Sequence, residues 1–339
     1  MKLITLSEKI LIAGANGMAG NAIYHALKKS GYGNPKYNGK FLNPSRNELD
    51  FSDYSQVRDY FKKHKPSVVI IAVAKVGGIY ANKNYPTDFI LDNLKIQTNI
   101  IENAWKNGVK RLLFLGSSCI YPKFASQPLK EESLLTSSLE DTNEYYAIAK
   151  IAGLKLCAAL RKQHNFDTIC LMPTNLYGKG DNYHIMNSHV FAALIRRFYE
   201  AVENNALSVK CWGSGNPRRE FMNVEDLGSA AVFALESWNP EKEHQLKKNQ
   251  LTMEPLTYLN VGTGIDISIK DLAEMIASKF NYKGEIIWDK SKPDGTPVKV
   301  LDVSRINSLG WEAKIDLETG LENTIKFFKE NYASGNLRL

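Results

Sequence analysis

Short apolar runs alternate with helical patterns through the first half of the chain. The runs cover residues 9–15, 41–42, 68–74, 111–115 and 167–172, and segments 55–65, 86–107 and 143–164 between them have the periodicity of helices. An unbroken apolar run such as 68–74 is typical of a parallel strand buried on both faces. The pattern therefore predicts an α/β chain with a doubly wound parallel sheet.

The alternation of strand and helix ends near residue 180. Beyond it we expect a helix that ends near Glu203, a polar loop at 238–256, a strand and turn at 259–264, and a terminal helix at 317–331. We interpret residues 1–180 as one domain and residues 181–339 mainly as a smaller α+β lobe. The stretches near 205–235 and 258–264 are candidates to return to the first domain.

The composition excludes several classes of protein. The 339 residues are 44% hydrophobic and 23% charged, which is ordinary for a globular chain. No apolar run approaches the ~20 residues that span a membrane, so we expect a cytoplasmic protein. The four cysteines and six histidines form no C-x-x-C or H-x-x-x-H pair, so we expect no metal. The net charge of +7 is scattered, which suits solubility or attraction for nucleotides, and not nucleic acid.

Three glycines follow the first apolar run at intervals of three and precede a helical pattern. Gly14, Gly17 and Gly20 permit a tight turn, the approach of a pyrophosphate to helix N–H groups, and close packing of helix on sheet. With Asn16 and Met18 they form a candidate dinucleotide-binding loop. Residues 1–180 are therefore expected to be a Rossmann domain.

The segment after the second strand, residues 43–46, meets the adenosine ribose in such a fold. It contains Arg46 and has no acidic residue before Glu48. An arginine there suits a 2′-phosphate, so the segment favours NADP over NAD. The alternative for Arg46 is a solvated loop charge.

Tyr146 and Lys150 lie four residues apart in a helical pattern, on one face of the predicted helix. We expect the lysine cation to lower the pKa of the tyrosine, so that it exchanges a proton with a substrate oxygen. An exposed tyrosine beside a solvated lysine is the alternative. Ser117 follows the 111–115 strand, and a serine and a tyrosine that converge on one oxygen form a hydride-transfer arrangement.

Over nearly its full length the chain resembles the extended short-chain dehydrogenase/reductase family, through the three glycines, Ser117 and the Tyr146/Lys150 pair. Within it, the chain is similar to the GDP-L-fucose synthase family. The matching segments are 115–123, 146–153, 172–178, 187–190, 212–215 and 292–297. The resemblance implies NADPH as cofactor, a GDP-sugar substrate and a homodimer. It implies epimerisation of GDP-4-keto-6-deoxy-D-mannose at C3 and C5, then reduction at C4.

The resemblance also implies roles for single residues. Alone, Cys119 would be a small buried side chain and His189 the start of a helix; the family match makes them the base and the acid of epimerisation. Tyr146 would protonate the reduced oxygen, Ser117 would bind it, and Lys150 would hold the nicotinamide ribose. Further cofactor-binding candidates are Leu115, Gly116, Ser118, Pro173, Thr174, Asn175 and Leu176, with His189. The substrate-binding candidates are Arg197, Trp212, Arg219, Asp294 and Lys299.

The chain departs from that family at two positions. Asn16 stands where relatives carry an arginine, which leaves less positive charge near a 2′-phosphate, and Val298 stands where a basic residue is common. The alternatives are a sibling enzyme for a related GDP-4-keto sugar, such as a 6-deoxyheptose, and a non-catalytic NADP-binding sensor.

Overall fold

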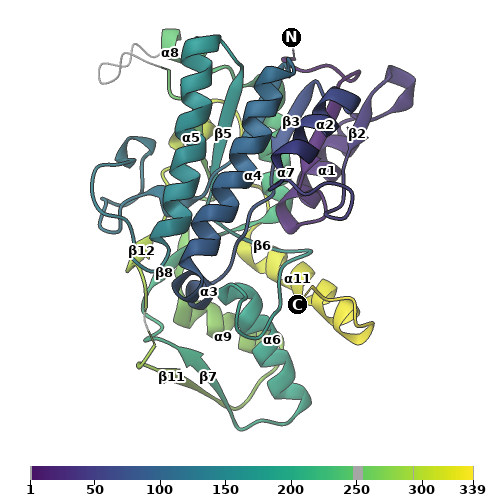
Figure 1. Cartoon of the computed structure of the whole chain (residues 1–339). Coiled ribbons are helices and arrows are strands. Elements are labelled where there is room, and N and C mark those ends of the chain that lie inside the picture. The colour runs from purple at the N-terminus through teal and green to yellow at the C-terminus, as the bar shows by residue number, and fades with distance from the viewer. Residues whose placement is uncertain (1, 247–254, 293, 339) are drawn as a thin grey trace.

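A parallel sheet forms the centre of the larger part of the molecule (Figure 1). The computed structural model describes residues 2–246, 255–292 and 294–338. Within them the sheet has six strands. Their order is β2 (Lys40–Leu42), β1 (Lys9–Ala13), β3 (Val68–Ile71), β4 (Arg111–Leu115), β5 (Thr168–Pro173) and β9 (Tyr258–Val261). The predicted doubly wound sheet is confirmed, and its strand order reverses between β1 and β3, where such folds bind ligands.

Helices cover both faces of this sheet because its strands are apolar on both sides. Side chains such as Leu11 and Val69 pack on α2 (Tyr54–His64), α4 (Pro86–Lys106) and α5 (Glu144–His164). Ile10 and Val68 pack on α1 (Met18–Lys29) and α7 (Val224–Ser237) on the other face. In Figure 1, α4 and α5 run side by side, and the Gln97 amide on α4 donates to the Ala149 carbonyl on α5 at 2.6 Å.

A smaller lobe with its own core lies below the central sheet in Figure 1. Its helices are α6 (Val190–Glu203), α9 (Ile269–Lys279) and α11 (Leu317–Ala333). One of its sheets joins β8 (Arg218–Asn223) to β10 (Asp266–Ser268), β12 (Val298–Lys299) and β6 (Asn175–Tyr177), and the other pairs β7 (Ser208–Trp212) with β11 (Glu285–Asp289). The shorter helices are η1 (Pro35–Tyr37), α3 (Ile79–Asn84), η2 (Ser118–Ile120), η3 (Glu131–Ser133), α8 (Pro240–Leu246) and α10 (Ser304–Ser308).

One buried carboxylate connects the two sheets. Glu220 on β8 is fully buried, and its Oε1 accepts the N–H groups of Thr263 (2.5 Å) and Gly264 (2.9 Å) just after β9. Its Oε2 accepts the N–H of Leu301 at 2.8 Å, two residues after β12. Burial raises the pKa of this carboxyl, whereas the three backbone donors oppose the rise. Glu220 therefore fixes β8, β12 and the end of β9 in one arrangement.

The predicted loop at 238–256 is wrong in its first part, where the structure has helix α8. The Asn239 side chain accepts the N–H groups of Glu241 (3.0 Å) and Lys242 (3.4 Å), which starts this helix locally. Residues 247–254 of that loop and Pro293 of the family-matching segment 292–297 lie outside the described residues. Among the described helices, none is both long enough and apolar enough to span a bilayer.

Candidate active site

The glycine loop after β1 is shaped by close backbone contacts. Gly14 has φ +92°, and a Cβ there would lie 2.7 Å from the Val73 nitrogen. A Cβ at Gly20 would lie 2.1 Å from the Gly14 oxygen, so both positions require glycine. Gly17 is the N-cap of α1, and the first turn of that helix contains no acidic residue. The N-terminus of α1 therefore suits an anion such as a pyrophosphate, with Asn16 and Met18 on either side of Gly17.

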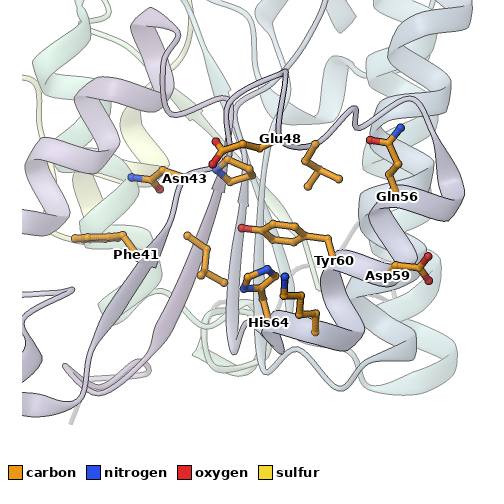
Figure 2. A pocket seen from close by; sticks show the side chains of 11 residues that line it. Phe41, Asn43, Glu48, Gln56, Asp59, Tyr60 and His64 are labelled. Atoms are coloured by element: carbon orange, nitrogen blue, oxygen red, sulfur yellow. The ribbon is translucent and has the colours of Figure 1, made fainter.

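A cavity of about 630 Å³ lies between β2 and α2, at the edge of the sheet (Figure 2). Asn43 and Glu48 line it, beside stacked Tyr60 and His64 rings. The Glu48 carboxylate accepts the Ser45 N–H at 2.7 Å, so this acid stabilises its own turn, and the hydrogen bonds from Ser45 lower its pKa. The cavity contains none of the predicted catalytic residues. Arg46 is exposed nearby and outside its lining.

Lys150 is buried beneath the sheet end. Its Nζ donates to the Leu115 carbonyl at 2.8 Å and lies 4.8 Å from the centre of the Phe114 ring. Burial lowers the pKa of this lysine to about 8. The Nζ is 5.8 Å from the centre of the Tyr146 ring, so the two predicted partners are on one helix face.

The expected lowering of the Tyr146 pKa by Lys150 is wrong. The pKa of the phenol is raised, first because the surrounding protein removes water and second because the Cys119 charge lies close; a Ser117 hydrogen bond opposes the rise. Lys150 instead donates to the backbone of Leu115. A neutral phenol is suited to donate a proton to a developing alkoxide.

The segment after β5 joins the central sheet to the smaller lobe. The Thr174 N–H donates to the Val261 carbonyl at 3.0 Å. The Thr174 hydroxyl (3.3 Å) and the Asn175 amide (2.7 Å) both donate to the Glu220 carbonyl. Pro173 ends β5, Asn175 and Leu176 lie on β6, and a Cβ at Gly116 would lie 2.2 Å from the Met172 sulfur.

Cys119 lies in η2, just after Ser117 and the buried Ser118. Its N–H donates to the Ser117 hydroxyl at 3.2 Å. Its sulfur accepts the Asn143 Nδ2 at 3.4 Å and the Lys299 Nζ at 3.8 Å. The cysteine is thus close to the predicted reductive residues and to a lysine that was predicted to bind substrate.

His189 is the N-cap residue of α6, and its side chain makes no capping hydrogen bond. Its pKa is lowered because the protein around the imidazole displaces water and because the Lys299 cation is near. Lys299 therefore acts on both residues that the family resemblance assigns to proton transfer.

The remaining substrate-binding candidates form a continuous set. The Arg197 guanidinium lies 5.5 Å from the centre of the Trp212 ring. The Asp294 carboxylate accepts the N–H (2.7 Å) and hydroxyl (2.8 Å) of Ser214, and the Arg219 Nη2 donates to the Asp294 carbonyl at 3.3 Å. Burial lowers the pKa of Arg219, whereas the charges of Cys119, Glu140 and Asp294 raise it. The substrate-binding candidates therefore lie between Arg197 at one end and Cys119 at the other.

Sequence reasoning missed Asn143 and Glu140. Asn143 was recognised only as a helix start, and no spacing in the sequence connects it to Cys119 or to Lys299. Glu140 accepts from Lys123 (3.1 Å) and from the Thr296 hydroxyl (3.3 Å), which fixes the loop after η2 against the C-terminal segment. The contacts of Asn143 with Cys119 and of Glu140 with Lys123 form within the first domain, whereas the contact with Thr296 forms only when the C-terminal segment lies against it.

A parallel sheet with a glycine turn, and a helix that carries Tyr146 and Lys150 beside it, are typical of Rossmann-type epimerases and reductases. The chain belongs to the NAD dependent epimerase/dehydratase family, whose profile matches residues 10–246. The GDP-L-fucose synthase of Escherichia coli (strain K12) is 48% identical over 324 residues, which cover 96% of this chain and 97% of that protein. The putative GDP-L-fucose synthase 2 of Arabidopsis thaliana is 49% identical over 329 residues, with coverage of 97% and 94%.

A solved structure of a GDP-mannoheptose C4 reductase from Campylobacter jejuni, with NADP bound, superposes with a TM-score of 0.82. It is 34% identical, and the match covers 96% of this chain and 99% of that one. The predicted resemblance to the extended reductases and to the GDP-L-fucose synthases is confirmed.

Proposed function

We propose that this protein converts GDP-4-keto-6-deoxy-D-mannose to GDP-L-fucose, by epimerisation at C3 and C5 followed by reduction at C4. The main observation behind the proposal is that candidate groups for proton transfer lie next to candidate groups for reduction. Cys119, with Lys299 and His189, is adjacent to the Ser117, Tyr146 and Lys150 set. The identity of 48–49% to two proteins named GDP-L-fucose synthase supports the same substrate.

The cofactor of the proposal is NADPH. The turn at Gly14 to Gly20 has no room for side chains at its ends and leaves the α1 N-terminus open, which fits a pyrophosphate. The turn and Arg46 would hold the adenosine end of NADPH, and Lys150 would lie at its nicotinamide ribose. Ser118, Thr174 and Leu176 would lie close to the same cofactor. When bound, NADPH supplies a hydride. We assign this binding to residues 1–180 together with α7 and β9, and substrate binding mainly to residues 181–339.

Epimerisation uses the acidity of protons next to a ketone. The Cys119 thiolate takes a proton from C3 or C5, and the electron pair of that bond moves into an enolate. His189 in its imidazolium form then returns a proton to the opposite face of the same carbon, which inverts it. Each cycle leaves a thiol and a neutral imidazole, so proton exchange with solvent restores both groups before the second carbon reacts.

Reduction uses the neutral state of Tyr146. As the C4 carbonyl gains a hydride, its oxygen becomes an alkoxide and takes the phenol proton. The Ser117 hydroxyl donates a hydrogen bond to the same oxygen and stabilises the charge as it develops. Arg197, Trp212, Arg219 and Asp294 would bind the GDP part, because a guanidinium pairs with phosphate oxygens and an indole packs on a ring.

A second candidate substrate is a related GDP-4-keto heptose. The similarity to a GDP-mannoheptose C4 reductase favours it. Retention of both Cys119 and His189 argues for a substrate that is also epimerised. A non-catalytic sensor would have no use for a cysteine that contacts a lysine in this position.

We propose a cytoplasmic homodimer that assembles through α4 and α5. The outer faces of these helices expose Leu91 (44%), Tyr145 (45%) and Ile148 (39%). Burial of such side chains against a second copy would stabilise the assembly. The four cysteines are unpaired, which suits a reducing compartment.

The test is incubation of the full chain with GDP-4-keto-6-deoxymannose and NADPH, with the product identified by NMR. We expect GDP-L-fucose and one NADPH oxidised per sugar. Absence of NADPH oxidation would refute the proposal, and turnover only with a GDP-4-keto heptose would select the second candidate.

A further inference from the structure

The Cys119 sulfur is held by two donors from distant parts of the chain. Asn143 precedes α5, and Lys299 lies on β12 in the smaller lobe. Their nitrogens are 3.4 and 3.8 Å from the sulfur. Both groups donate hydrogen bonds, so they stabilise a sulfur that carries negative charge more than they stabilise a neutral thiol.

Asn143 contacts Cys119 instead of capping helix α5 with its side chain. It occupies the N-cap position of α5, where an asparagine side chain usually accepts a helix N–H, yet it makes no capping bond among the described residues. Its Nδ2 donates to Cys119, and its Oδ1 is buried without a partner in the described part of the chain. This orientation of the amide does not stabilise helix α5; it directs the Nδ2 hydrogen-bond donor toward the Cys119 sulfur.

The position of Lys299 is fixed by strand pairing within the protein itself. It pairs with Arg219 across β12 and β8, and Leu301, two residues on, is bound to Glu220. Arg219 also faces Cys119, but its guanidinium donates to the carbonyls of Arg218 (2.8 Å) and Asp294 (3.3 Å). In the described part of the chain, Lys299 is therefore the cation that donates a hydrogen bond to the sulfur.

We propose that Asn143 and Lys299 are positioning residues that stabilise the Cys119 thiolate. The inference rests on the proposed function for its consequence in catalysis, but the state of the sulfur is testable without any sugar.

The charged groups around the sulfur give the direction of the effect. Tyr146 on α5, Arg219 on β8 and Lys299 on β12 lie around Cys119. The base must be a thiolate, and removal of Lys299 takes away the cation that donates to it, so proton abstraction at C3 and C5 should slow. Because Lys299 contacts the base, this loss should appear in kcat more than in KM.

The first test is alkylation of Cys119 by iodoacetamide at pH 7 in the full chain, followed by peptide mass spectrometry. Cys157, Cys170 and Cys211 are buried, so their protection also reports that each variant is folded. We expect Lys299→Met to slow labelling about tenfold and Asn143→Ala about threefold, and Lys299→Arg to retain most of the rate. The matched control is Lys290→Met, which removes an exposed lysine after β11 and should change nothing. Equal labelling in Lys299→Met and the native chain would overturn the proposal, whatever the outcome with sugars.

The second test is the rate of solvent deuterium incorporation at C3 and C5 as a function of sugar concentration. We expect kcat for exchange to fall about tenfold in Lys299→Met and about threefold in Asn143→Ala, with KM within about twofold of the native value. A higher KM with an unchanged kcat would make Lys299 an ordinary substrate contact and contradict the proposal. Failure of the native chain to exchange any deuterium would instead count against the proposed function.

Discussion

Two adjacent groups of residues in this molecule are built in different ways. The hydride site (Ser117, Tyr146 and Lys150) lies at the end of β4 and on α5, and its contacts with β4, η2, α4 and α5 all involve elements around the central sheet. The proton-transfer cluster (Cys119, Asn143, His189, Arg219 and Lys299) takes its members from η2, the start of α5, α6, β8 and β12. The first group needs one sheet, whereas the second exists only when two sheets are joined.

This difference separates the two halves of the proposed reaction. A change within the hydride site should stop reduction and leave proton exchange intact. A change within the proton-transfer cluster, or in the residues that join the sheets, should do the reverse. The largest expected effect falls on Tyr146.

Tyr146→Phe removes the proton donor for the C4 oxygen. We expect NADPH oxidation with the 4-keto sugar to fall by roughly 1,000-fold, because a positioned general acid contributes about 10²–10⁴. Deuterium incorporation at C3 and C5 should persist, since Cys119 keeps both of its donors. Stopped-flow absorbance at 340 nm and NMR of the exchanged sugar measure the two steps. Equal loss of both activities would contradict the separation of the two groups.

Cys119→Ser should impair proton exchange and leave cofactor binding intact. A serine hydroxyl is not ionised near neutral pH, so we expect exchange at C3 and C5 to fall roughly 100-fold. The affinity for NADPH, measured by fluorescence titration, should stay within twofold of the native chain. Cys211→Ser, at a buried cysteine in the smaller lobe, is the matched control and should retain exchange. Exchange at the native rate in Cys119→Ser would mean that another residue is the base.

Glu220→Gln tests the connection between the sheets. A glutamine amide would place a donor against the N–H of Thr263 or of Leu301, where the carboxylate accepts at 2.5 and 2.8 Å. We expect the free energy of unfolding in urea to fall by about 2 kcal/mol. Exchange at C3 and C5 should decrease more than NADPH affinity, because Lys299 and Arg219 depend on this residue and the glycine loop does not. Glu285→Gln, at an exposed position on β11, should leave stability within about 0.5 kcal/mol.

The sequence predicts the two groups of residues, the hydride site and the proton-transfer cluster, to different extents. The buried strands, the glycine loop and the Tyr146/Lys150 spacing depend on neighbours within a few residues or on a repeated fold rule, so pattern predicts the sheet and, with the family resemblance, names the candidates for the hydride site. The contact of Lys299 with Cys119 joins residues 180 positions apart. It depends on the pairing of β12 with β8, and a strand of two residues leaves almost no pattern. The state of Tyr146 was mispredicted for a related reason, because burial outweighs a neighbouring cation that is bound to a carbonyl.

The last expected effect, a gradual change of stability with pH, concerns the charge of Lys150 in the chain without cofactor. Burial lowers its pKa to about 8, whereas a lysine in the unfolded chain keeps its proton to about 10.4. Between pH 8 and 10 the unfolded state therefore binds more protons than the folded state at this residue. The contribution of Lys150 to the free energy of unfolding should rise with pH in that window, by at most about 1.4 kcal/mol per pH unit.

Buried thiols act in the opposite direction, because burial raises the pKa of Cys211 to about 11 and keeps it protonated in the folded state. The comparison of the native chain with Lys150→Met, by urea unfolding at pH 7, 8, 9 and 10, cancels the thiol contribution. We expect the stability of the native chain relative to Lys150→Met to increase from pH 8 to pH 10 and to be constant below pH 7. A constant difference across the whole range would mean that Lys150 titrates as an ordinary lysine. The buried lysine of the hydride site would then stay charged even when no cofactor is bound.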